Sequence, residues 1–132
     1  MAELAVRKIG KYEIVSKLGE GATSTVYLAR DEFNSREVAI KLVSQSALND
    51  EARGKLMHNL FLNEASLAGK LNHPHIVQIY DAVSDEDNTY IVMEYVSGGT
   101  LQRFTRADNL LALGDVIEVI YKCARALDFA SQ

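Results

Sequence analysis

The 132-residue sequence is poor in the residues that cross-link a chain, interrupt it or anchor it in a membrane. One cysteine cannot form an internal disulfide, and a single proline with scattered glycines leaves no flexible linker between domains. No apolar run approaches the roughly 20 residues that a membrane-spanning helix needs. Because the N-terminus also lacks a basic-then-apolar leader, we expect no membrane segment in this chain and a reducing, cytoplasmic location.

Positive charge is also scarce. Fourteen Lys and Arg against 18 Asp and Glu give a net charge of −4, whereas a nucleic-acid surface needs an excess of basic side chains. We therefore expect no nucleic-acid partner. The hydrophobic share of 48% and the charged share of 24% are typical of a soluble globular domain, which at this length can build a core without metal or disulfide support.

The sequence does contain segments typical of strands and helices. Three predicted strands precede a long helix, and two further strands and two further helices follow it. β-branched and aliphatic residues between turn residues predict strands at 12–18, 25–30, 37–43, 76–83 and 89–96. Apolar residues at helical spacing predict helices at 50–71, at about 101–106 and from Asp115 to the end. The strand at 89–96 is almost wholly apolar, so we expect it to be central in the sheet.

Two charged side chains fall among apolar ones. Lys41 shares a strand face with Ala39 and Val43, and Glu64 falls within a helical stripe of leucines. The stripe consists of Leu56, Leu60, Leu67 and Leu71. A lone buried charge costs several kcal/mol, so pairing Lys41 with Glu64 would satisfy both. The alternatives are an edge lysine that reaches water and a boundary glutamate turned to solvent.

A glycine pattern, Gly19-x-Gly21-x-x-Ser24-x-Val26, lies between the first two strands. Glycines lacking Cβ atoms let backbone amides approach phosphate oxygens, although an ordinary hairpin turn has the same composition. A dinucleotide-binding loop would open a helix, and a P-loop would need Gly-Lys-Ser/Thr, so neither fits.

Two other features favour structural roles. His73-Pro74-His75 has no matching set of further Cys or His ligands, so we expect a turn and no metal site. Cys123 lies in an apolar helical segment, where we expect a buried thiol. Asp115 and Glu118 are spaced as in a capping box at the start of that helix.

Taken in order, these motifs resemble those of eukaryotic-type protein kinases and are most similar to the bacterial serine/threonine kinases. The motifs are Lys11-Tyr12, Leu18 to Gly21, Val38 to Lys41, Glu64, His73 to Val77, and Ile91 to Val96 followed by Gly98-Gly99. The resemblance covers 12–132. It implies an α+β fold, a kinase-like N-lobe with a five-stranded antiparallel sheet and one long helix. Residues 1–11 would form an N-terminal tail, 12–96 the small lobe and hinge, and 97–132 the incomplete start of the large lobe.

The same resemblance implies that the chain binds ATP. Lys41 and Glu64 would be the catalytic pair, in which Lys41 holds the α- and β-phosphates and Glu64 positions it. Met93 would be the gatekeeper. The implied nucleotide-binding residues are Leu18, Gly19, Glu20, Gly21, Ala22, Thr23, Ser24, Thr25, Val26, Ala39, Lys41, Met93 and the backbones of Glu94 and Val96.

The sequence departs from the family pattern in two ways. Ser24 stands where the third loop glycine would be, and it lies between two further hydroxyl residues. The 132 residues also contain no His-Arg-Asp, Asp-Phe-Gly or Ala-Pro-Glu motif, so the catalytic base and the Mg²⁺ ligands of the family are not among them.

We therefore expect the N-terminal part of a serine/threonine protein kinase, whose parent uses ATP and Mg²⁺ to phosphorylate a protein substrate. The 132-residue fragment by itself should be inactive. The alternative is a truncated, non-catalytic, kinase-like interaction module. Without the rest of a large lobe, the apolar final helix would be uncovered, so we also expect self-association through it.

Overall fold

The computed structural model describes residues 7–85 and 87–132. The chain divides into two compact units. The first comprises the chain up to Lys70 together with Gln78–Tyr95, and the second comprises Leu71–Val77 and Val96–Gln132. Most of the segment expected to be an N-terminal tail, residues 1–6, lies outside the described residues.

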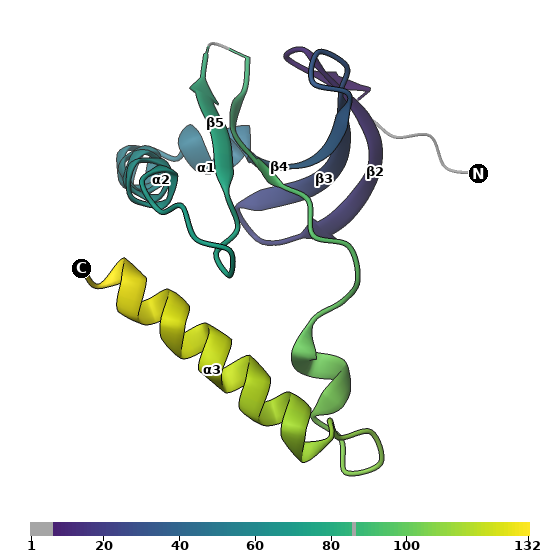
Figure 1. The fold of residues 1–132 in the computed structure, drawn as a ribbon. Coiled ribbons are helices and arrows are strands. Elements are labelled where there is room, and N and C mark those ends of the chain that lie inside the picture. The colour runs from purple at the N-terminus through teal and green to yellow at the C-terminus, as the bar shows by residue number, and fades with distance from the viewer. Residues whose placement is uncertain (1–6, 86) are drawn as a thin grey trace. The chain divides into compact units, whose positions relative to one another are not determined.

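The first unit is built on a curled antiparallel sheet of six strands in the order β1-β2-β3-β4-β6-β5 (Figure 1). The strands are β1 Lys8–Ile9, β2 Tyr12–Glu20, β3 Ser24–Asp31, β4 Arg36–Val43, β5 Ile79–Ser84 and β6 Thr89–Glu94. The α+β fold is confirmed, and β6, which was expected to be central, is an interior strand that lies between β4 and the edge strand β5. The sheet has one strand more than the five predicted. Part of the expected tail forms β1, where Ile9 is completely buried.

One face of this sheet, here called the closed face, carries the main core. Val38, Ile40 and Val92 have no exposed surface, and the alternation of side chains along each strand brings them to the same side. The buried residues of this core are Ile9, Tyr12, Ile14, Ala29, Val38, Ile40, Tyr90 and Val92. The other face, here called the open face, carries a smaller cluster in which Val43 and Ile91 pack against Phe61.

Phe61 belongs to α2 Gly54–Gly69, which lies beside β5 and is preceded by the short helix α1 Gln45–Leu48 (Figure 1). The expected start of the helix at residue 50 is wrong. The Asp50 carboxylate accepts hydrogen bonds from the backbone N–H groups of Ala52 and Arg53, and this local turn precedes the helix.

The expected leucine core of α2 is also wrong. Leu56, Leu60 and Leu67 are each at least half exposed, and the helix buries Gly54 and Phe61 instead. A Cβ atom at residue 54 would meet the carbonyl oxygen of Leu48, so the glycine permits the close approach of α1. Phe61 packs against the sheet and Gly54 packs against α1, in place of the leucines that were expected to be buried.

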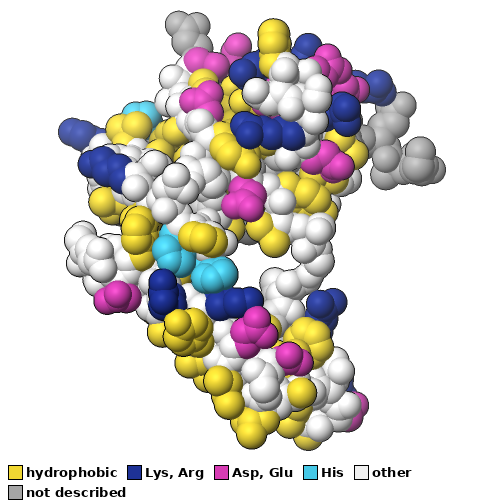
Figure 2. Space-filling view, viewed as in Figure 1, with side chains coloured by type: hydrophobic (Ala, Val, Ile, Leu, Met, Phe, Trp, Pro, Cys, Tyr) yellow, Lys and Arg dark blue, Asp and Glu magenta, His cyan; other side chains and the backbone are white. Residues whose placement is uncertain are grey.

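The second unit contains the 3-10 helix η1 Leu101–Phe104 and the long helix α3 Leu113–Ala130. Of the residues in α3 only Ala126 is buried, and hydrophobic side chains gather on the helix surface (Figure 2). Cys123 is exposed, so the expected buried thiol is wrong. The expected capping box is wrong as well, because the helix begins after Ala112 and Asp115 lies within its first turn. No described helix meets the length and hydropathy that a membrane span requires.

Candidate functional site

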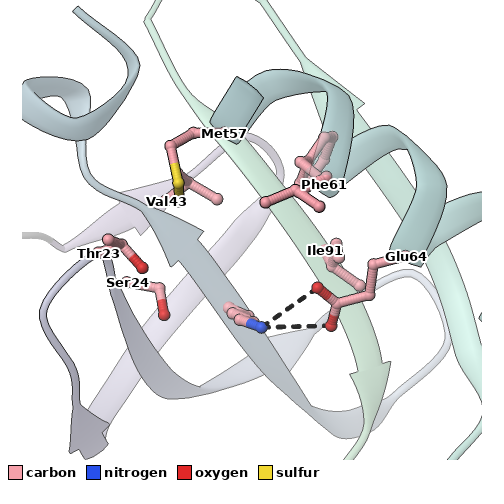
Figure 3. A pocket seen from close by; sticks show the side chains of 9 residues that line it. Thr23, Ser24, Val43, Met57, Phe61, Glu64 and Ile91 are labelled. Atoms are coloured by element: carbon pink, nitrogen blue, oxygen red, sulfur yellow. Dashed lines mark hydrogen bonds and ion pairs between the residues drawn. The ribbon is translucent and has the colours of Figure 1, made fainter. Parts of the chain in front are cut away.

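The expected ion pair between the sheet and α2 is present. Lys41 Nζ on β4 lies 3.2 Å from Glu64 Oε1 and 3.3 Å from Oε2 (Figure 3). The expectation that both charges are buried is wrong, because the side chains are 32% and 50% exposed. A pair this accessible to water stabilises a fold by at most about 1 kcal/mol. Stability therefore does not account for two charges meeting on the open face.

The strand register shows which side chains share that face. Val26 lies opposite Lys41 in the β3–β4 pair, and Ile91 lies opposite Lys41 in the β4–β6 pair. By the same register Ala39 faces Leu28 on one side and Met93 on the other. Residues directly opposite one another project to the same face. The predicted nucleotide-binding residues Val26, Ala39, Lys41 and Met93 therefore lie on one side of the sheet.

The glycine pattern forms the β2–β3 hairpin. Gly21 N–H donates to the Ser24 carbonyl at 2.8 Å, and the N–H of Ser44, the residue directly after β4, donates to the Thr23 carbonyl, also at 2.8 Å. Gly19 in β2 lies opposite Val26 in β3, and a Cβ atom added to Gly19 would have no neighbour within 4 Å. Neither Gly19 nor Gly21 has a positive φ. The fold itself therefore does not require glycine at position 19, which leaves space for an external group.

Two other residues of this hairpin differ in their surroundings. Leu18 falls at an irregularity in the β2–β3 register and is 46% exposed. The Glu20 carboxylate is bound by Lys17 Nζ at 2.8 Å, and this hydrogen bond lowers the pKa of Glu20 and raises that of Lys17. Glu20 is thus held as a carboxylate by its own strand.

A cavity of about 70 Å³ opens between the hairpin, β4 and α2 (Figure 3). Its lining consists of Thr23, Ser24, Lys41, Val43, Met57, Leu60, Phe61, Glu64 and Ile91. Met57, Leu60 and Phe61 were not predicted as part of the site. They precede Glu64 by seven, four and three residues, so helical spacing from Glu64 was the signal that could have identified them.

Three further predicted residues lie at or just after the end of β6. Met93 is half-buried. Glu94 N–H donates to the Gln78 carbonyl at 2.8 Å, and Glu94 Oε1 accepts from Gln78 N–H at 3.1 Å. Val96 is 63% exposed and belongs to the second compact unit. Among residues 7–85 and 87–132, no group of three or more His, Cys, Asp or Glu side chains is placed to hold a metal ion.

The protein kinase domain profile matches residues 12–131. The chain belongs to the protein kinase family. It is 37% identical over 123 residues to the serine/threonine-protein kinase PrkC of Bacillus subtilis, and 40% identical over 126 residues to PknB of Mycolicibacterium smegmatis. These matches cover 93% and 92% of the chain, but only 18% and 20% of the two relatives.

Solved structures give the same result. The kinase domain of Mycobacterium tuberculosis PknI aligns with a TM-score of 0.74 and 29% identity, over 97% of the chain and 51% of that domain. The chain thus spans about a fifth of the length of the curated relatives and about half of a solved kinase domain.

Proposed function

We propose that this chain is the ATP-binding part of a serine/threonine protein kinase, which transfers the γ-phosphoryl group of ATP to protein hydroxyls. The observation that carries the proposal is the Lys41–Glu64 pair, placed on the open face beside the glycine hairpin. The relatives named above, PrkC and PknB, are serine/threonine-protein kinases, which supports this class of acceptor.

Lys41 would bind the nucleotide phosphates. Its ammonium group carries the positive charge that favours phosphate oxygens, and the two oxygens of Glu64 hold it over the open face. Glu64 acts through Lys41 and is therefore a positioning residue. Charge that develops on the phosphates during transfer would be stabilised by a cation already in place, which is a large source of catalysis.

The hairpin and the neighbouring strands would enclose the rest of the nucleotide. The space beside Gly19 would allow backbone amides close to phosphate oxygens. Val26, Ala39 and Met93 offer an apolar surface for the flat base, with Leu18 near the end of β2, and the backbone of Glu94 would bind its edge. Protein kinases in general also use Mg²⁺, for which we assign no residue of this chain.

The test is phosphoryl transfer from labelled ATP to a generic protein substrate by the full-length protein. Lys41→Met leaves an unbranched side chain of similar reach but removes its charge, and we expect a loss of at least about 100-fold in kcat. Glu64→Gln can still accept a hydrogen bond from Lys41, so its loss should be smaller. Lys55→Met, an exposed lysine on α2, is the matched control and should keep activity within about twofold.

Wild-type turnover by Lys41→Met would contradict the proposal, and a greater loss in Glu64→Gln than in Lys41→Met would contradict the pairing argument. If the wild-type full-length protein transferred no phosphate, a non-catalytic interaction module would be the better account. Self-association through α3 and a cytoplasmic location remain predictions.

A further inference from the structure

The residue that departs from the glycine pattern lies beside the ion pair. Ser24 begins β3 and lies opposite Val43, two residues along β4 from Lys41. It is therefore a diagonal neighbour of Lys41 on the open face, where such positions are about 7–8 Å apart, within reach of one bound group. Thr25, the next residue, lies opposite Leu42 and projects to the closed face.

The backbone at Ser24 does not call for glycine. Ser35 is the one non-glycine residue with positive φ among the described residues, so Ser24 adopts an ordinary conformation. Its carbonyl accepts the Gly21 N–H and thereby closes the hairpin. In the described part of the chain, the Ser24 hydroxyl makes no hydrogen bond of its own, although Ser24 is only partly exposed.

Ser24 also lines the cavity that contains the Lys41–Glu64 pair. Figure 3 shows Thr23 and Ser24 on the hairpin side of this cavity and Glu64 on the helix side. At about 70 Å³ the cavity is far below the 300–1,000 Å³ that is usual for a whole ligand. It suits one end of a ligand, such as a single phosphate group.

The charges in this cavity explain why a neutral hydroxyl would help to bind a phosphate. The carboxylate of Glu64 offsets the positive charge of Lys41, so a phosphate that enters the cavity needs hydrogen-bond donors in addition to the Lys41 ammonium group. A glycine at position 24 could offer only its backbone. Serine adds an O–H donor on the face where the phosphates would lie.

We propose that the Ser24 hydroxyl donates a hydrogen bond to a phosphate oxygen of the nucleotide beside Lys41, and so binds the phosphates directly. This inference rests on the proposed ATP-binding function. It assigns to a side chain a contact that the glycine pattern alone would leave to the backbone.

The experiment compares the affinities of the full-length protein for ATP, ADP and adenosine by isothermal titration calorimetry. In Ser24→Ala, we expect ATP and ADP to bind about fivefold to tenfold more weakly, because one hydrogen bond to a charged group is lost. Adenosine has no phosphate, so its affinity should stay within about twofold of wild type. The KM for ATP should rise by the same factor as the Kd, with a smaller change in kcat.

Two variants control for structural damage. Ser24→Thr keeps a hydroxyl on the same face and should restore ATP affinity to near the wild-type value. Ser66→Ala removes an exposed hydroxyl on α2, outside the predicted nucleotide-binding residues, and should leave ATP affinity unchanged. Thermal unfolding without nucleotide should be the same for Ser24→Ala and wild type, since the lost hydroxyl has no partner within the described chain.

Equal weakening of ATP and adenosine in Ser24→Ala would indicate a merely structural role and overturn the inference, as would unchanged ATP affinity. If Ser24→Ala were silent while Lys41→Met abolished transfer, only the role of Ser24 would be refuted. If the wild-type protein bound neither ATP nor ADP, the proposed function itself would fail.

Discussion

Ile40 and Lys41 are adjacent in β4, yet Ile40 has no exposed surface whereas the Lys41 side chain is 32% exposed. Ile40 projects into the core of the closed face, and Lys41 projects to the open face with its partner Glu64. The strand period of two thus places the main core on one face and the Lys41–Glu64 pair, which the proposed function assigns to the nucleotide, on the other. Substitutions on the two faces should therefore separate folding from function.

The largest expected difference in stability is between those two neighbours. Ile40→Ala leaves a cavity in a fully buried position and should lower the free energy of unfolding by about 2–5 kcal/mol. Lys41→Met breaks only a half-exposed ion pair and should change it by less than about 1 kcal/mol. Urea unfolding followed by circular dichroism measures both. A loss in Lys41→Met as great as in Ile40→Ala would contradict the division between the faces.

Substitutions of two glycines, one near each face of the sheet, should give a difference in stability of intermediate size. Gly10, in the β1–β2 turn, has a φ of +56°, and a Cβ atom there would meet the hydroxyl of Tyr90, a member of the closed-face core. Gly10→Ala should therefore cost about 1–3 kcal/mol of stability, because it adds both strain and a steric conflict. Thermal unfolding should show this as a lowered Tm.

Gly19→Ala is the matched substitution in the glycine hairpin, since residue 19 has neither a positive φ nor a close neighbour. Its stability should stay within about 0.5 kcal/mol of wild type, while its affinity for ATP falls because the new methyl group occupies the space beside the hairpin. Equal destabilisation by the two substitutions would show that the hairpin also needs its glycine for folding.

The smallest expected effect concerns Asp31, the carboxylate that is buried among the described residues at the end of β3. The Asn34 side chain, which donates to Asp31 Oδ2 at 2.7 Å, is the main cause that lowers the pKa of Asp31 below 3.8. Backbone N–H groups of Phe33 and Asn34 add to this effect. The stabilisation that Asp31 contributes is therefore present at pH values above its ordinary pKa of 3.8. It is lost as the pH falls through the lower pKa that Asp31 has in the folded state.

Asn34→Ala tests this dependence. The wild type should be more stable than the variant at about pH 7, and the difference should shrink as the pH falls through the lowered folded-state pKa of Asp31. Urea titrations at a series of acid pH values give the comparison. A difference that does not change with pH would mean that Asn34 acts through something other than the Asp31 carboxylate.

The sequence led to the ion pair but not to its surroundings. Alternation along residues 37–43 and helical spacing around Glu64 were enough to predict that Lys41 meets Glu64. The prediction that leucines form the buried side of α2 failed, because spacing shows which residues share a helix face and not which face has a neighbour. Phe61 makes the contact with the sheet instead. The helix begins at Gly54 because the Asp50 carboxylate accepts hydrogen bonds from the next backbone N–H groups and forms a turn there.

The sequence by itself determined the order of five strands and the two long helices, the glycine hairpin and the strand face on which Lys41 lies, because these depend on local backbone preferences and the strand period. Only the tertiary structure decided that the Lys41–Glu64 pair is half exposed, that Lys8–Ile9 adds a sixth strand, and that Ser24 lines the same cavity as Lys41. These features depend on register and burial, which arise from residues far apart along the chain.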